Sequence, residues 1–302
     1  MPLPLLLDCD PGHDDVMAIV AAACHGELVG ITTVAGNAAL PHTTRNALLT
    51  CELAGIDAPI HAGAAGPLKG EVFDATHVHG AEGLDGVELR DPVGTVVSGD
   101  APLFIVEAAR TIADLWLVPV GPLTNIALAL EIEPRLAQLV AGISIMGGGS
   151  FGNATPAAEF NIFADPEAAD VVFRSGARIR MCGLDLTHQV CADRAFIASL
   201  AELGTPIGDF TAGLMTFYAQ RIIELTGSDL AALHDVCAVL AVTHPDCFEF
   251  GRHSVRVELD GRYTRGMTVI DQRIPDTGAV EVAWGVDADR VLALLYQAVA
   301  SA

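Results

Sequence analysis

The stretch Leu5-Leu-Leu-Asp8-Cys9-Asp10-Pro11-Gly12-His13-Asp14-Asp15 decides the fold. The apolar run 3–7 leading into it predicts a buried strand, and the run 16–23 that follows predicts a buried helix. Strand, acidic turn and helix in this order place polar side chains at the carboxyl edge of a parallel sheet. Four carboxylates within eight residues repel one another unless protons or a cation offset their charge. A hard divalent cation with oxygen ligands is the simplest counter-charge.

Beyond this stretch, strand-like and helix-like segments alternate along the chain. We expect strands at 28–34, 59–63, 114–120, 142–146 and 178–184, and helices at 41–54, 102–112, 124–130 and 166–174. Residues 64–99 are glycine-rich and irregular, 192–243 are mostly helical, and strand-like runs at 254–259, 264–270 and 280–282 precede a final helix from about residue 287. The alternation predicts an α/β fold in which residues 1–302 form one domain, a Rossmann-like, open, mainly parallel sheet with helices on both faces.

Composition narrows the classes of partner. The formal net charge is -22 and Lys69 is the only lysine, so the surface repels polyanions, and we expect no nucleic-acid or membrane partner. No apolar run reaches the length of a membrane span, and the first residues lack the basic region of a signal peptide. The seven cysteines are scattered and never spaced as C-x-x-C, which favours a reducing cytoplasm and a role as small core residues.

The acidic cluster has a simpler alternative explanation. Pro11-Gly12 forms a turn, and an aspartate at a helix start caps the helix and interacts favourably with its dipole. Capping accounts for one or two of the four carboxylates but not for Asp8 and Asp10, which share one face of the strand end. We therefore favour a metal site.

Polar groups follow other predicted strands. Asn37 is either a turn residue or a second polar group at the same sheet edge. The segment Gly121-Pro122-Leu-Thr124-Asn125 is mainly a tight strand–helix connection with Thr124 as its cap, and the Val120 carbonyl before it can face the site. In 153–161, alternation puts Glu159 and Asn161 on one side and Phe160 on the other. Two amides and a carboxylate on one loop suit recognition of several hydroxyls, although a solvated loop is the alternative.

Two histidines are further candidates, although a lone histidine is usually structural. His234-Asp235 begins the apolar run 236–240 and so forms a second acidic helix start. Asp235 is placed to complete a metal shell begun far away in sequence, and His234 is a candidate general acid because its unperturbed pKa lies near neutrality.

These motifs together resemble those of a known family. The opening Asp8-Cys-Asp10-Pro-Gly-His-Asp14-Asp15 resembles the D-x-D-P-G-x-D-D signature of the inosine/uridine-preferring nucleoside hydrolases. Further motifs match in family order, namely Val34-Ala-Gly-Asn37, Gly121-Pro-Leu-Thr-Asn125, Met146-Gly-Gly, Asn153-x-Thr-Pro-Ala-Ala-Glu159-Phe-Asn161, His234-Asp235 and Thr264-Arg-Gly-Met-Thr268. The resemblance therefore spans about the whole chain and implies the nucleoside hydrolase fold.

The resemblance implies an enzyme that hydrolyses the N-glycosidic bond of ribonucleosides with bound Ca²⁺. The ion would be held by Asp10, Asp15, Asp235 and the Val120 carbonyl, and Asp10 would activate a calcium-bound water. The 2′- and 3′-hydroxyls of ribose would be held by Asp14, Asn37 and Asn161, and the 5′-hydroxyl by Asn153 and Glu159, with Asp8 supporting the loop from behind. His234, with His79, would assist the departing base, and the family is commonly dimeric or tetrameric.

The nucleobase end departs from the family pattern. The stretch 77–86 resembles the family's H-G-x-D-G-L-G loop but contains Glu82 and an altered ending. The helix around Tyr218 would form the other wall, and packing inside the helix is the equal alternative for this tyrosine. Preference for purines or pyrimidines therefore stays open.

Two other classes of protein are alternatives. Asp8-x-Asp10 after a strand resembles the nucleophile motif of haloacid-dehalogenase-like phosphatases. Such enzymes use a lysine near the transferred phosphate, and Lys69 in a Gly/Pro-rich loop is the only candidate. A non-catalytic nucleoside-binding protein would need neither Asp10 as a base nor His234 as an acid.

Overall fold

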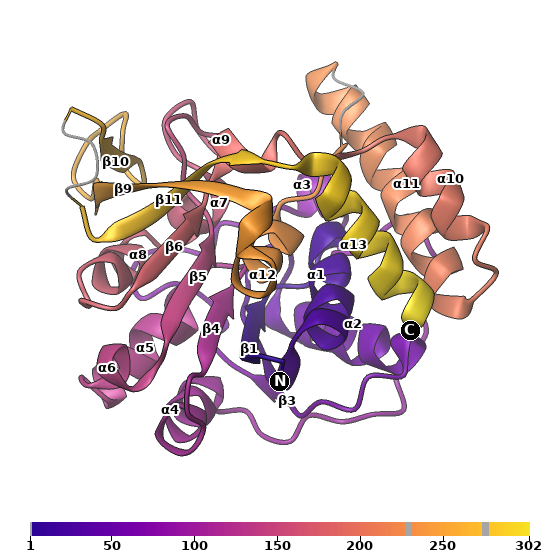
Figure 1. The fold of residues 1–302 in the computed structure, drawn as a ribbon, viewed down its shortest axis with the longest axis horizontal. Helices are drawn as coiled ribbons and strands as arrows, with labels where there is room; N and C mark the ends of the chain where they lie inside the picture. The colour runs from indigo at the N-terminus through magenta and orange to yellow at the C-terminus, as the bar shows by residue number, and fades with distance from the viewer. Residues whose placement is uncertain (1, 228–230, 274–277) are drawn as a thin grey trace.

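The computed structural model describes residues 2–227, 231–273 and 278–302. In these residues, β1 (Pro4–Cys9) lies inside a nine-stranded sheet of order β10-β9-β11-β6-β5-β4-β1-β2-β3 (Figure 1). All neighbouring pairs from β3 to β11 are parallel, whereas β9 pairs antiparallel with both β11 and β10. The prediction of an open, mainly parallel α/β sheet is confirmed.

The strands and helices alternate over the first 182 residues and then give way to a helical region and a C-terminal hairpin. The other strands are β2 (Glu27–Thr33), β3 (Ile60–Ala62), β4 (Trp116–Pro119), β5 (Gly142–Met146), β6 (Ile179–Cys182), β9 (Phe248–Val257), β10 (Thr268–Asp271) and β11 (Val280–Val286), and β7 (Cys191–Ala192) pairs with β8 (Ala231–Ala232) in a separate small sheet. The helices are α1 (His13–His25), α2 (Leu40–Ala54), α3 (Thr76–His79), α4 (Ala101–Thr111), α5 (Thr124–Ile132), α6 (Leu136–Leu139), α7 (Phe160–Ala164), α8 (Pro166–Phe173), α9 (Leu184–Thr187), α10 (Arg194–Ala201), α11 (Pro206–Thr226), α12 (Asp235–Thr243) and α13 (Ala288–Ser301), with a 3₁₀ turn at Pro245–Cys247.

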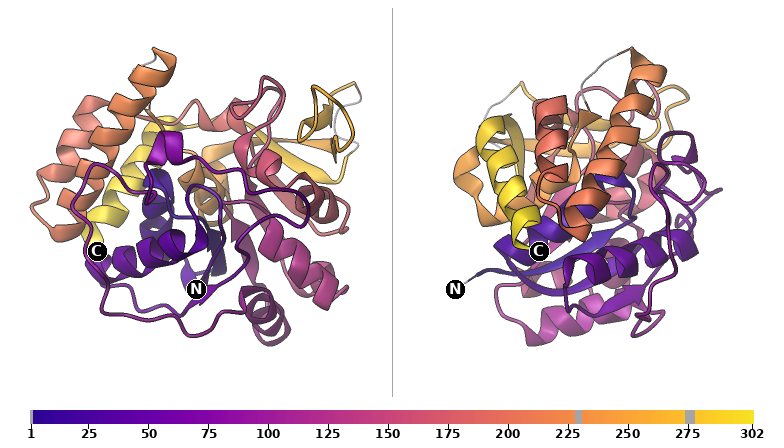
Figure 2. Two further views of the ribbon diagram at one scale, coloured as in Figure 1. Left: turned by 180° about the vertical axis from the view of Figure 1, so that it is seen from behind. Right: turned by 90° about the vertical axis from the view of Figure 1, so that its right-hand side faces the viewer.

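Both faces of the sheet are covered, as the continuous apolar run of β1 requires. Leu5 and Leu7 point into a core shared with α1, α2, α12 and α13, while Leu6 points into the opposite core shared with α4, α5 and α8. Figures 1 and 2 show these two helical layers on either side of the strands. Successive side chains of a strand point to opposite faces of the sheet. A central strand covered on both faces is therefore apolar at every position until its carboxyl end.

The strand order reverses at β1. The chain moves from β1 to β2 and β3 on one side, and then returns to β4, β5 and β6 on the other. Loops leaving the carboxyl ends of β1 and β4 therefore diverge, which opens the crevice where ligands bind in sheets of this kind. The acidic turn after β1 and the Val120 carbonyl after β4 lie at this point.

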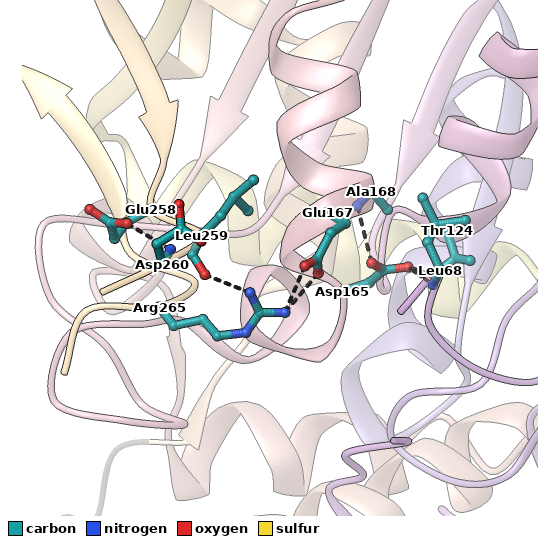
Figure 3. A network of polar contacts seen from close by, with 9 residues as sticks. All are labelled: Leu68, Thr124, Asp165, Glu167, Ala168, Glu258, Leu259, Asp260 and Arg265. Carbon is teal, nitrogen blue, oxygen red and sulfur yellow. Dashed lines mark hydrogen bonds and ion pairs between the residues drawn. The ribbon is translucent and has the colours of Figure 1, made fainter. Parts of the chain in front are cut away.

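The C-terminal strands differ from their predicted bounds. β9 begins at Phe248, earlier than the expected residue 254, and the expected start of the next strand at residue 264 is wrong, because residues 264–267 form a turn in which Gly266 has φ +81°. Arg265 of this turn donates to Glu167 Oε2 at 2.7 Å and to the Leu259 carbonyl at 2.6 Å, so the Thr264–Thr268 motif fastens the hairpin to α8 (Figure 3). Beside it, Asp165 accepts from Leu68 N and Thr124 Oγ1.

Two smaller expectations also have an outcome. Thr124 does not cap α5, because its hydroxyl donates to Asp165 and it is the first helical residue rather than the cap. All seven cysteines are free thiols, and five of them are buried, in keeping with core positions. Across residues 2–227, 231–273 and 278–302, none of the helices combines the length and apolarity needed to cross a bilayer.

Candidate active site

The acidic turn between β1 and α1 is buried. Asp8, Asp10 and Asp15 are fully buried and Asp14 is 5% exposed. Asp15 accepts hydrogen bonds from the backbone N–H groups of Asp10 at 3.1 Å and Gly12 at 2.9 Å, and from Asn37 Nδ2 at 3.0 Å. Asp15 therefore does cap the turn, as the simpler explanation expects, but capping leaves Asp8, Asp10 and Asp14 unaccounted for.

The Asp10 carboxylate lies between two glycines. Its Oδ2 accepts from Asn37 N at 2.7 Å, while its Oδ1 is buried and has no partner among the described residues. A Cβ added to Gly36 would lie 2.1 Å from Oδ2, and one added to Gly121 would lie 2.4 Å from Oδ1. The glycines of the two downstream motifs are therefore required by the close approach of their backbone to Asp10.

Asp8 lies behind this carboxylate. Its Oδ1 accepts from Thr32 Oγ1 at 2.6 Å and from Asn125 Nδ2 at 2.7 Å, and its buried Oδ2 has no partner among the residues described. Burial raises the pKa of Asp8 to about 7, although these two hydrogen bonds oppose the shift. The Asn125 amide, from the predicted strand–helix connection, thus links β1 to the start of α5.

Three carboxylates from two distant segments are close enough to hold one ion. Ligand oxygens of Asp14, Asp15 and Asp235 all lie within 4.8 Å of one another. Asp235 is the first residue of α12, which confirms the predicted acidic start of a helix. The cluster contains two of the predicted protein ligands, Asp15 and Asp235, together with Asp14, which the resemblance places on ribose.

The donor set fits a hard cation. The ligands are carboxylate oxygens, and Asp10, whose charge acts on Asp235, has a buried oxygen without a partner among the described residues. Burial first, and then the charge of Asp15, holds the pKa of Asp10 well above its ordinary value; for Asp235 the causes are burial and the charge of Asp14. A divalent cation would offset both the repulsion and the missing hydrogen bond.

A cavity of about 600 Å³ opens above the cluster. Ten predicted site residues line it: Asp14, Asn37, His79, Val120, Asn153, Glu159, Asn161, Tyr218, His234 and Asp235. Asp10 and Asp15 lie directly behind the wall, where Asn37 donates to both of them. The structure thus brings all twelve predicted residues to one place.

Glu159 is the cap of α7 rather than part of an extended loop. Its carboxylate accepts from the backbone N–H groups of Asn161, Ile162 and Gly148 at 2.9 to 3.1 Å. Because the chain is helical from Phe160, the expected alternation fails, and Phe160 lines the same cavity as its neighbours. Asn161 Nδ2 donates to the Val120 carbonyl at 2.8 Å, which joins this segment to the end of β4.

At the other end of the cavity, rings replace carboxylates. His79 and Tyr218 are buried and stack with centroids 5.8 Å apart, and His13 stacks on Tyr218 at 5.5 Å. Nδ1 of His13 lies 2.9 Å from Nδ1 of His79. Burial lowers the pKa of both imidazoles, that of His13 to about 4. Tyr218 thus both packs in its helix and faces the cavity.

The sequence did not single out several cavity residues. Phe73 comes from the irregular loop, and His188 and Cys191 come from the short segments after α9. His188 lies beside His234, with ring centroids 5.7 Å apart. Burial, and then the charge of His188, lowers the pKa of His234 to about 3. No periodic pattern marks these positions, because they lie in loops and in elements of two to four residues.

A carboxylate-floored cleft at the switch point of a parallel sheet defines a ligand-binding α/β enzyme. Comparison with known proteins gives the family. Residues 5–293 match the family model described as inosine-uridine preferring nucleoside hydrolase. The chain therefore belongs to this family and is a nucleoside N-ribohydrolase, an enzyme that hydrolyses N-glycosyl bonds of ribonucleosides.

The relatives act on different bases. The chain is 41% identical to the pyrimidine-specific ribonucleoside hydrolase RihA of Salmonella typhimurium, over 96% of this chain and 95% of the relative. It is 40% identical to the inosine-uridine preferring nucleoside hydrolase of Leishmania major, over 99% and 98%. The solved purine-preferring ribonucleoside hydrolase from Gardnerella vaginalis superposes with a TM-score of 0.93 at 32% identity, covering 98% of each chain.

Proposed function

We propose that the cavity binds a ribonucleoside with its sugar at the carboxylate end and its base at the histidine end. The observation that carries this orientation is the division of one cavity into an acidic floor and an aromatic wall. Sugar hydroxyls need paired donors and acceptors, which the carboxylates and amides supply, whereas a planar base gains from stacking on rings.

Ca²⁺ is the ion we infer for the acidic floor. Asp10, Asp15, Asp235 and the Val120 carbonyl are the proposed ligands, and Asp14, which lies in the same cluster, would share the ion with ribose. When bound, the ion would lower the pKa of the attacking water and orient the sugar diol. The preference for calcium over smaller ions follows from an irregular, all-oxygen donor set.

Asp10 is the proposed general base. Its Oδ2 is held by the Asn37 N–H, which leaves Oδ1 as the atom able to take a proton from water. The two flanking glycines fix the carboxylate in place, so that the attacking water is oriented rather than free.

The ribose contacts follow from the same arrangement. Asp14, Asn37 and Asn161 would hold the 2′- and 3′-hydroxyls, and Asn153 and Glu159 would hold the 5′-hydroxyl. N-glycosidic cleavage passes through an oxocarbenium-like state, which buried carboxylates stabilise by their charge. His234, with His79, would donate to the departing base. Neither ring excludes purines or pyrimidines by its chemistry, and the relatives include both preferences.

A panel of purine and pyrimidine nucleosides, assayed with calcium by the release of reducing sugar, tests this function. Ribose release from at least one nucleoside is expected, and no release from any of them would contradict the proposal. Phosphate release from phosphomonoesters would instead support a phosphatase, although Lys69 is exposed and does not line the cavity.

We also infer that residues 1–302 act as one domain, that the protein forms a homodimer or homotetramer, and that it works in the cytoplasm. The reduced state of all seven thiols is compatible with that compartment. Light scattering after size-exclusion chromatography tests the oligomer, and a monomer at micromolar concentration would contradict it.

A further inference from the structure

Thr187 is a buried residue beside His234, and the roles above leave it unused. It is the last residue of α9 and is fully buried. Its Oγ1 lies 2.8 Å from Nδ1 of His234. Among residues 2–227, 231–273 and 278–302 the hydroxyl forms no other hydrogen bond.

The direction of this hydrogen bond follows from the inventory of donors and acceptors. A buried hydroxyl needs an acceptor for its one hydrogen, and within the described part of the chain its one partner atom is His234 Nδ1. Thr187 therefore donates, and Nδ1 carries the lone pair. A neutral imidazole whose Nδ1 accepts must carry its hydrogen on Nε2.

The opposite side of the ring is free for a ligand. His234 lines the cavity, and its Nε2 has no hydrogen-bond partner in the part of the chain that is described. The backbone N–H of His234 donates to Asp14 Oδ2 at 3.2 Å, which fixes the residue from its main chain as Thr187 does from its side chain.

We propose that Thr187 is a positioning residue that holds His234 as the Nε2–H tautomer, with this hydrogen directed at the nucleobase. The proposal rests on the proposed role of His234. When the glycosidic bond breaks, its electron pair goes to the base, and the Nε2–H hydrogen bond stabilises that charge while the base takes its proton from solvent. The other tautomer would present a lone pair to the same charge and would oppose departure.

The test compares leaving groups. Thr187→Val keeps the shape but removes the hydroxyl, and Thr187→Ser retains it. We expect Thr187→Val to lower kcat/KM for inosine or uridine by about tenfold, the effect of one hydrogen bond. Its value for 4-nitrophenyl β-D-ribofuranoside should change little, because nitrophenolate departs as a stable anion. Thr187→Ser should restore the rate on nucleosides.

His234→Ala separates failure of this proposal from failure of the proposed function. If it loses about 10²–10³-fold on nucleosides but little on the nitrophenyl riboside, while Thr187→Val shows equal losses on both, the positioning role is wrong. If His234→Ala itself shows no such difference, the proposed contact of His234 with the departing base is wrong and Thr187 has nothing to position.

A second measurement reports the tautomer of His234 directly and needs no change at Thr187. In the wild-type protein labelled with ¹⁵N-histidine, the His234 signals, assigned by their absence in His234→Ala, report which ring nitrogen carries the hydrogen. Protonation at Nε2 supports the proposal, and protonation at Nδ1 overturns it.

Discussion

The two ends of the cavity are built in different ways. At the carboxylate end, Asp8, Asp10 and Asp15 are fully buried and are held by hydrogen bonds from residues that follow or belong to neighbouring strands. At the nucleobase end, walls come from the irregular loop, the short segments after α9 and helix α11, and Phe73 and Leu225 remain 37% and 46% exposed.

Under the proposed function, this difference separates the residues of the reaction from those that select the base. The carboxylate end is fixed by strand ends, whose positions are constrained on both faces by the core, so a change there disturbs the reaction itself. The nucleobase end lies on loops, on short elements and on the C-terminal half of α11, and side chains on such partly exposed loops exchange more readily. The different base preferences of relatives with the same fold agree with this division.

The largest expected effect comes from Asp10→Asn. Loss of the proposed base should lower kcat by about 10²–10⁴-fold with the fold intact by circular dichroism. Asp8→Asn is the matched control, since it too is a buried aspartate of the same segment with one unpartnered oxygen, but it lies behind the site. A loss for Asp8→Asn as large as that for Asp10→Asn would contradict their different roles.

Gly121→Ala should come next. The new Cβ would lie 2.4 Å from Asp10 Oδ1 and must displace the carboxylate, so we expect roughly a 100-fold loss of kcat, as for small misplacements of a reacting group. Gly99→Ala is the control, because a Cβ there meets nothing within 4 Å. Full activity of Gly121→Ala in the reducing-sugar assay would show that the close approach of the Gly121 backbone to Asp10 is not needed for catalysis.

Calcium should stabilise the protein in a pH-dependent way. Burial raises the pKa of Asp14 to about 7, so the folded, metal-free protein binds protons that the unfolded chain releases between about pH 4 and pH 7, and its stability falls as the pH rises through that range. Since calcium competes with these protons, the rise in Tm caused by calcium should be larger at about pH 8 than at about pH 5. Thermal melts with calcium or with a chelator measure this rise in Tm. Equal rises at both pH values would contradict a calcium site formed by these carboxylates.

The smallest effect is expected at the nucleobase end. Tyr218→Phe removes one hydroxyl from the ring that stacks with His79, so the ratio of kcat/KM between nucleosides should change by less than about tenfold, with kcat for the preferred substrate nearly unchanged. Tyr263→Phe, at a side chain 78% exposed, is the control. A collapse of kcat in Tyr218→Phe would place this residue in the chemistry and remove the division between the two ends.

The same division explains what the sequence predicts. Apolar runs that end in Asp8–Asp15 and Asn37 locate strand ends directly, because a buried strand must turn polar where it leaves the core. The helical start at Phe160 was missed because one aromatic between two polar residues fits either period. His188 and Thr187 were missed because their roles depend on His234, nearly fifty residues away, and no local pattern records that contact.

His234 and Asp235 are consecutive residues, one facing the proposed leaving base and the other the proposed ion. Adjacent Cα atoms are about 3.8 Å apart, so this single peptide fixes the distance between the group that faces the base and the group that faces the ion. A furanose fits that length, because its anomeric carbon adjoins the 2′-carbon that carries one of the held hydroxyls. Sugars that place the diol farther from the scissile bond would engage one end or the other, but not both.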